Sequence, residues 1–170
     1  EIFADAPDAI VTVHPGGKWW VRDEFIHEPW YSFIGYQSGH GDDDDAFRWI
    51  VQGPPHADWA KQPMRPIINL EAPYEDHISY HSQKRHDAHS VRRASYWSLL
   101  NAPTAGITYG AHGIWGWDDG SAPPVGHETT GTAQAWQKAL NLPGAEQMRH
   151  LVSAFESIDW WNLRPVDDVL

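Results

Sequence analysis

The sequence predicts an α/β fold with a parallel sheet. Four short β-branched or aromatic segments lie along its 170 residues, and stretches of helical or linking composition separate them. Strands that alternate with helical segments are typical of such folds. Polar clusters follow directly on the ends of the predicted strands, where both barrels and open α/β sheets place their active sites. We therefore expect the functional residues to gather at one edge of the sheet.

Each predicted strand stops at turn-forming or polar residues, which supports its assignment. The short gap between the first two strands leaves room for a loop or a single helical turn only. The strands, each with the loop that follows it, are 9–13 with 14–17, 30–36 with 37–40, 65–70 with 71–75, and 105–110 with the aromatic loop 111–119.

Helices are predicted between and after these strands. The aspartates at 42–45 precede an apolar helical pattern, and acidic residues favour the positive end of a helix. A calcium site is the alternative for them, but the loop pattern of alternating ligands is missing. A small-residue stripe runs through Ala88, Val91, Ala94 and Ser98, and two further helices are expected over 132–140 and 145–157.

Composition argues against several classes of partner. Twelve Lys and Arg against 23 Asp and Glu give a net charge of -11, which repels phosphate backbones and anionic lipids, so we expect neither nucleic-acid nor membrane binding. Cysteine is absent, which excludes disulfides and thiolate zinc sites. Neither a phosphate-binding glycine loop nor a Gly-x-Ser-x-Gly elbow is present. The 11 Trp and 6 Tyr suit both a core and a platform for sugar rings.

Four ordered motifs carry a resemblance to a known family. They are residues 36–40, residues 66–71 with 73–75, residues 91–97 and residues 108–115. Together they resemble the apiosidase-like family of bacterial glycoside hydrolases, which includes family 140. The resemblance implies a retaining glycosidase on a (β/α)₈ TIM barrel, often followed by a small β-sandwich. It also favours a secreted or periplasmic enzyme without a cofactor.

The resemblance places this chain in the second half of the barrel. The four predicted strands would be the fifth to the eighth, so residues 1–158 would form the C-terminal half and residues 159–170 an exit towards a sandwich. A complete barrel takes about 250 residues, and four strands do not close an eight-stranded one. We therefore expect the chain to need the N-terminal half-barrel or a second chain. The sequence begins without Met, which we interpret as a processed or excised segment.

Glu71 is the predicted catalytic residue, because it matches the nucleophile position of the family. A retaining glycosidase needs an ionised carboxylate and a protonated carboxyl about 5 to 5.5 Å apart. The family's acid/base aspartate would lie upstream of Glu1. The alternative role for Glu71 is a structural pair with Arg92 or Arg93, and Glu75 is the substitute carboxylate, otherwise expected to be solvated or to bind substrate.

The remaining candidates are predicted to bind a carbohydrate substrate. His14, His40 and His112 each follow a strand and are expected to converge on one pocket, with a three-histidine zinc site as the competing hypothesis. Tyr74 and Tyr109 are candidates to donate to the nucleophile or the ring oxygen, and Trp115 and Trp117 to form one stacking face on an extended segment. The full substrate-binding set is His14, Gln37, His40, Tyr74, Glu75, Tyr109, His112, Trp115 and Trp117, without a metal.

These residues leave three functions open. The first is a retaining glycoside hydrolase that acts on side chains of a polysaccharide or oligosaccharide. The second is a carbohydrate-binding remnant without catalysis. The third is a metal-dependent hydrolase that uses His14, His40 and His112.

Overall fold

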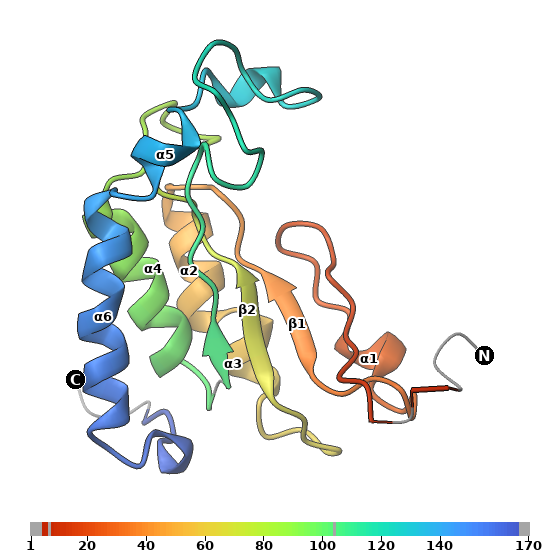
Figure 1. Cartoon of the computed structure of the whole chain (residues 1–170). Helices are drawn as coiled ribbons and strands as arrows, with labels where there is room; N and C mark the ends of the chain where they lie inside the picture. Colours follow the sequence, from red (N-terminus) through yellow and green to blue (C-terminus); the bar gives the residue numbers. More distant parts are fainter. Residues whose placement is uncertain (1–4, 7, 104, 167–170) are drawn as a thin grey trace.

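A parallel sheet forms the centre of the chain. The computed structural model describes residues 5–6, 8–103 and 105–166. Within them, β1 (Ile34–Gln37), β2 (Ile67–Glu71) and β3 (Gly106–Ile107) lie in the order β1-β2-β3 and pair in parallel (Figure 1). The register aligns Ile34 with Ile67, and it shifts between Tyr36 and Gln37. The predicted α/β fold with a parallel sheet is therefore confirmed.

The prediction of a strand at residues 9–13 is wrong. This segment runs beside β1, and Ser32 N–H donates to the Val11 carbonyl at 2.8 Å, but a hydroxyl makes the next contacts. Thr12 Oγ1 donates to the Phe33 carbonyl at 2.6 Å and accepts from Gly35 N–H at 3.2 Å. Because the threonine hydroxyl takes the place of backbone groups, no regular ladder forms there.

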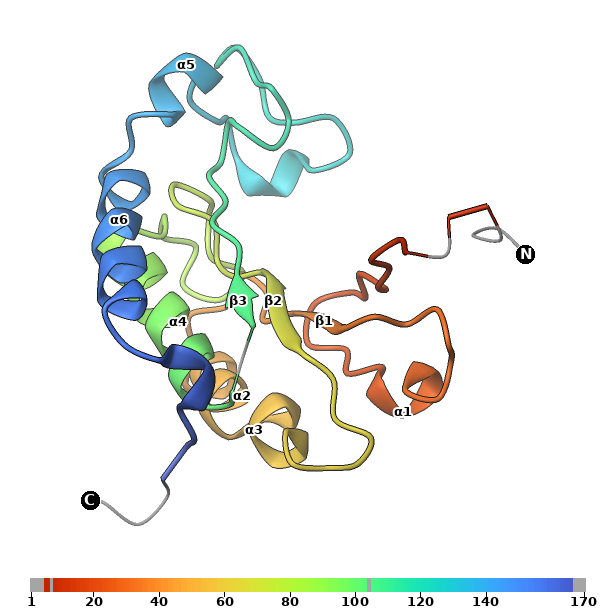
Figure 2. The same cartoon turned by 60° about the horizontal axis from the view of Figure 1, so that its bottom comes forward.

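Helices gather on one side of the sheet. In Figures 1 and 2, α2 (Asp44–Gln52), α3 (Pro54–Asp58), α4 (Ala88–Leu100) and α6 (Pro143–Glu156) lie together on that side. The α1 helix (Arg22–Phe25) is the single turn expected between the first two predicted strands. Among the described residues no helix is long and apolar enough to cross a membrane.

Two predicted helix starts are confirmed, each with an aspartate cap. The Asp43 carboxylate accepts from Ala46 N–H at 2.8 Å at the start of α2. Asp87 does the same for Ser90 N–H at 2.8 Å at the start of α4, and Val91, Ala94 and Ser98 of its small-residue stripe are buried. A side-chain oxygen that accepts from the first turn satisfies an otherwise unpaired N–H, which explains the preference for Asp here.

The C-terminal region differs from the prediction in one helix. α6 matches the helix expected over 145–157, but the helix expected over 132–140 shrinks to α5 (Trp136–Ala139). Long-range contacts hold the residues before α5 out of the helix: Arg85 donates to the Thr132 carbonyl, and Gln134 donates to Asp76. Two 3-10 turns, η1 (Glu128–Thr130) and η2 (Trp160–Asn162), complete the elements.

The main apolar core lies beside β1 and β2. Its fully buried members come from both strands and from the N-terminal segment, and four of the 11 tryptophans pack against it, so much of the aromatic excess is core. The buried members are Ile26, Tyr31, Ile34, Tyr36 and Ile67, and the tryptophans are Trp20, Trp30, Trp49 and Trp59.

Candidate active site

Glu71 is placed by a buried asparagine two residues before it. Asn69 Oδ1 accepts from Glu71 N–H at 3.2 Å and from Ser38 N–H at 3.4 Å. Its Nδ2 donates to Ser38 Oγ at 3.0 Å and to Ser98 Oγ of α4 at 2.9 Å. Since one buried amide joins both strand ends to α4, the backbone at Glu71 has little freedom.

The Glu71 carboxylate receives hydrogen bonds on both of its oxygens. Gln37 Nε2 donates to Oε2 at 2.9 Å, and His40 Nε2 lies 2.8 Å from Oε1. His14 Nε2 lies 3.4 Å from Oε2 and 3.1 Å from Gln37 Nε2. The predicted gathering of strand-end residues thus holds for His14, Gln37, His40 and Glu71, and the glutamate side chain is only 17% exposed.

The pKa values of this cluster favour an ionised Glu71. Burial alone would raise the pKa of Glu71, but the hydrogen bond from His40, the charge that His40 and His14 carry when protonated, and a hydrogen bond from Tyr74 outweigh it, so the pKa is lowered. Burial and the Glu71 charge raise the pKa of Tyr74 to about 12. Tyr74 therefore keeps its proton and acts as a donor at neutral pH.

The alternative structural partners of Glu71 are engaged elsewhere. Arg92 bonds Gln147 of α6, and the Arg93 guanidinium lies 4.0 Å from the ring centre of Phe47 and 5.2 Å from that of Trp97. An arginine over an aromatic face gains a cation–π contact. The alternative role of Glu71, a structural pair with Arg92 or Arg93, is therefore wrong.

The expected convergence of three histidines is also wrong. His112 is separated from His40 by His77, whose ring stacks on His40 at 4.2 Å and lies 5.3 Å from His112. His112 instead contacts the Asp76 carbonyl and Thr130 Oγ1, both at 3.3 Å. Over the part of the chain that the structure describes, no three His, Cys, Asp or Glu residues are grouped to hold a metal ion.

Glu75 and Tyr109 form a structural pair rather than facing Glu71. Tyr109 Oη donates to Glu75 Oε2 at 2.6 Å, and Gly144 N–H in the first turn of α6 donates to Oε1 at 2.9 Å. Glu75 is 2% exposed. The expectations that Glu75 is solvated and that Tyr109 donates to the nucleophile are therefore wrong, because the loop after β2 directs this carboxylate to the positive end of α6.

Trp115 and Trp117 do not share one face. The segment around them is a series of turns, with positive φ at Gly113 (99°) and Trp117 (51°), whereas a common face needs extended backbone. Trp115 lies parallel to His112 at 6.5 Å, and Trp117 meets Trp136 edge-on at 5.3 Å. The predicted single stacking platform is therefore wrong, although both side chains are exposed.

Sequence reasoning missed Asn69 and His77. Asn69 carried a signal, because it is a polar residue inside the apolar run 67–70, and such a residue needs buried partners. His77 gave no signal beyond its place in a His-rich stretch. Its stacking on His40 results from the course of the loop after β2.

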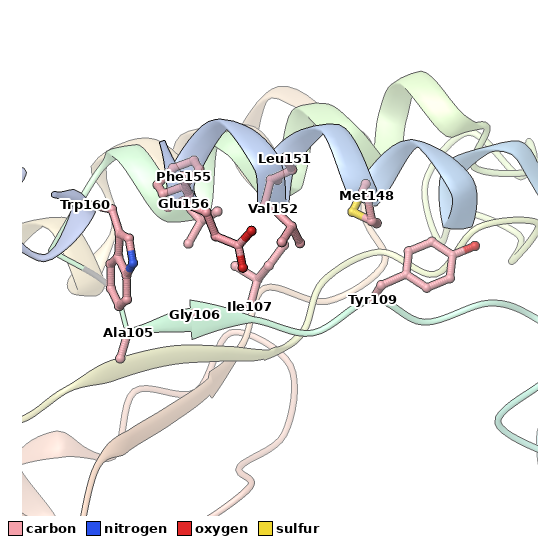
Figure 3. A pocket seen from close by; sticks show the side chains of 11 residues that line it. Ala105, Gly106, Ile107, Tyr109, Met148, Leu151, Val152, Phe155, Glu156 and Trp160 are labelled. Carbon is pink, nitrogen blue, oxygen red and sulfur yellow. The ribbon is translucent and has the colours of Figure 1, made fainter. Parts of the chain in front are cut away.

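Two hollows lie apart from Glu71 itself. A hollow of about 320 Å³ adjoins His40, and its lining includes Lys18, Asp43 and Tyr80. An apolar cavity of about 370 Å³ lies between β3 and α6, and Figure 3 shows Ile107 facing Val152 across it. The lining of the cavity is Leu99, Ala105, Gly106, Ile107, Tyr109, Met148, Leu151, Val152, Phe155, Glu156 and Trp160.

Several solved structures are similar to this chain, and two of them are glycoside hydrolases. One is a glycoside hydrolase family 5 protein from Bacteroides vulgatus ATCC 8482, with a TM-score of 0.79 and 27% identity over 95% of this chain and 36% of that one. The other is described as a glycoside hydrolase, with a TM-score of 0.70 and 29% identity over 89% of this chain and 36% of that one. The chain thus spans 36% of the length of each.

No curated protein matches the sequence, but a family model does. The family model described as "Apiosidase-like, catalytic domain" matches residues 1–162, which is nearly the whole chain and includes every residue of the candidate site. The chain therefore belongs to the apiosidase-like catalytic-domain family.

Proposed function

We propose that this chain supplies the nucleophile half of a retaining glycoside hydrolase that acts on side chains of polysaccharides or oligosaccharides. One observation carries the proposal: Glu71 is a carboxylate at the carboxyl end of the middle strand, held by donors on both oxygens and kept ionised by a lowered pKa. A nucleophilic carboxylate needs this charge state and fixed position. Family membership and both glycoside hydrolase structures support it.

In the proposed reaction, a Glu71 oxygen attacks the anomeric carbon while the glycosidic C–O bond breaks. The leaving oxygen takes a proton from an acid/base carboxyl outside this chain. We place that carboxyl in the part of the barrel that this chain does not span, since it covers 36% of the similar family 5 structure. Water activated by the same carboxyl then cleaves the glycosyl ester and restores the Glu71 carboxylate. The anomeric configuration is retained because the centre is inverted twice.

Gln37 and His14 are proposed to contact the sugar beside Glu71. Both lie on the side of Oε2, and the His14 side chain is 48% exposed. Trp115 and Trp117 remain proposed contacts only as separate exposed rings. His112, by contrast, is fully buried and engaged with protein atoms, which leaves it no proposed substrate contact.

We further propose that strands outside the described residues complete the barrel. β3 pairs with β2 alone within the described residues, and the apolar cavity next to it lies between β3 and α6. An unpaired strand edge beside an apolar cavity favours association with another strand. The N-terminal half of the same protein is the proposed partner.

Glu71→Gln in the intact protein tests the nucleophile. The amide keeps the volume but lacks the negative charge, so kcat should fall by about 10³-fold or more while the melting temperature stays within a few degrees. Release of reducing sugar from plant polysaccharides and from apiose-bearing oligosaccharides measures turnover, and NMR of the first product shows whether its anomer is retained. Glu24→Gln, at an exposed position of α1, is the matched control.

Two results would contradict the proposal. More than about a tenth of the activity in Glu71→Gln would remove Glu71 as nucleophile. An inverted product would exclude the double displacement. Sugar binding by the intact protein without turnover would instead support the carbohydrate-binding alternative. One observation favours that alternative: Glu75, the carboxylate nearest to Glu71 in sequence, is bound to Tyr109 and α6 and so does not serve as a second catalytic carboxyl.

A further inference from the structure

His40 has a fixed tautomer because of its neighbours. Tyr74 N–H donates to His40 Nδ1 at 3.2 Å, and a backbone amide only donates, so Nδ1 carries a lone pair. The proton of the neutral ring therefore lies on Nε2, which is 2.8 Å from Glu71 Oε1. An ionised carboxylate only accepts, so this contact is an Nε2–H donation to Glu71.

The imidazole of His40 is enclosed on several sides. His77 stacks on one face at 4.2 Å with an angle of 18°, and Tyr74 and Tyr80 meet the ring edge-on at 4.7 and 5.6 Å. His86 Nε2 donates to the His40 carbonyl at 3.0 Å. The side chain is 5% exposed, and both of its nitrogens have protein partners, so neither is free for a sugar hydroxyl.

We propose that His40 is a positioning residue: the Tyr74 amide locks its tautomer, and the locked Nε2–H holds Glu71 Oε1. The proposal rests on Glu71 as nucleophile and replaces the predicted substrate-binding role of His40. It also distinguishes the two carboxylate oxygens. Oε1 is held on the buried side by His40, so Oε2, beside Gln37 and the half-exposed His14, is the attacking oxygen.

The tautomer is tested directly by NMR of the intact protein with ¹⁵N-labelled histidine, in which loss of the signal in His40→Gln assigns His40. At neutral pH, Nε2 should give the resonance of a protonated ring nitrogen and Nδ1 that of an unprotonated one. The reverse pattern, or an equal mixture of both tautomers, would overturn the proposal. This readout needs no turnover.

A pair of amide variants tests the positioning role. The amide nitrogen of His40→Gln reaches the place of Nε2 and can still donate to Glu71, whereas that of the shorter His40→Asn lies near Nδ1 and cannot. We expect His40→Asn to lower kcat by about 10- to 100-fold with KM changed less than about twofold. The acid limb of its kcat/KM profile should move to higher pH, because Glu71 loses a donor to its charged form. His40→Gln should recover most of kcat and the original acid limb.

The outcomes separate the two proposals. Equal losses in both amide variants, or a raised KM with unchanged kcat, would overturn the positioning role and return His40 to substrate binding. An active Glu71→Gln with the Nε2–H tautomer intact would overturn the nucleophile but leave the hydrogen-bond scheme standing. An inactive Glu71→Gln with the reversed tautomer would overturn only the role of His40.

Discussion

His77 is a buried imidazole that the fold keeps uncharged. Its Nδ1 donates to the Ile78 carbonyl at 2.7 Å, and burial, followed by repulsion from the charge that His40 carries when protonated, lowers the pKa of His77 from 6.5 to about 3. The unfolded chain, with the higher pKa, binds more protons between these two values. The His77 contribution to stability is therefore complete above pH 6.5 and is lost as the pH falls towards 3.

We predict that this group contributes about 1.4 kcal/mol per pH unit to the slope of unfolding free energy below its unfolded pKa. His77→Asn removes the titrating group and retains a donor near Nδ1. The slope of unfolding free energy against pH should therefore fall by about 1.4 kcal/mol per pH unit, the equivalent of one proton. Urea unfolding at several pH values between 4 and 7 measures it. His150→Asn, on an exposed position of α6, is the control. Equal slopes in the wild type and His77→Asn would contradict the buried, uncharged state.

At the scale of elements, Glu75 connects the loop after β2 to the start of α6. Its carboxylate accepts from Tyr109 Oη and Gly144 N–H, and α6 has no side-chain cap of its own. A Cβ on Gly144 would lie 2.3 Å from Glu75 Oε2. The glycine is therefore needed for close approach of the carboxylate rather than for an unusual backbone angle.

Gly144→Ala should destabilise the protein by about 1 to 3 kcal/mol, because the displaced carboxylate loses a buried hydrogen bond. Urea unfolding measures the change, and Ser153→Ala, at an exposed site of α6, is the control. In a Glu75→Ala background the same substitution should cost much less, since the obstructing oxygen is gone. Additive losses in the double variant would show that the clash is not with Glu75.

At the scale of the whole molecule, β3 is an edge strand of the sheet within the described residues, and an apolar cavity lies beside it. The cavity of about 370 Å³ is lined on the α6 side by Met148, Leu151, Val152 and Phe155 (Figure 3). Val152 is 48% exposed although it faces β3. In the proposed complete barrel, the added strands pair with β3 and cover this region.

The isolated 170-residue chain should therefore self-associate. Val152→Glu places a charge at the cavity and should reduce this association, whereas Ser153→Glu, the neighbouring exposed position, should leave it unchanged. Light scattering over a range of concentrations measures the average mass. A monomer at all concentrations would contradict the need for a partner. Co-expression with the N-terminal half should give a one-to-one complex.

The sequence by itself determined the features that depend on residues close together along the chain. Local patterns and turn residues predicted the runs that became β1 to β3, the acidic start of α2 and the placement of Glu71 at a strand end. The gathering of Gln37, His40 and Glu71 also followed, because parallel strands bring their carboxyl ends to one edge. The family motifs lie between residues 36 and 115, and the family they indicated is the one whose model matches residues 1–162.

Only the tertiary structure decided where side chains point beyond the strand ends. Glu75 turns to α6, which begins 68 positions later at Pro143, because an unpaired helix N-terminus attracts a carboxylate. His77 rather than His112 stacks on His40 because the loop after β2 folds back across the strand edge. Residues 9–13 form no regular ladder because the hydroxyls of Thr12 and Ser32 take the place of backbone partners. These outcomes depend on long-range contacts between loops, which neither residue spacing nor intrinsic propensity specifies.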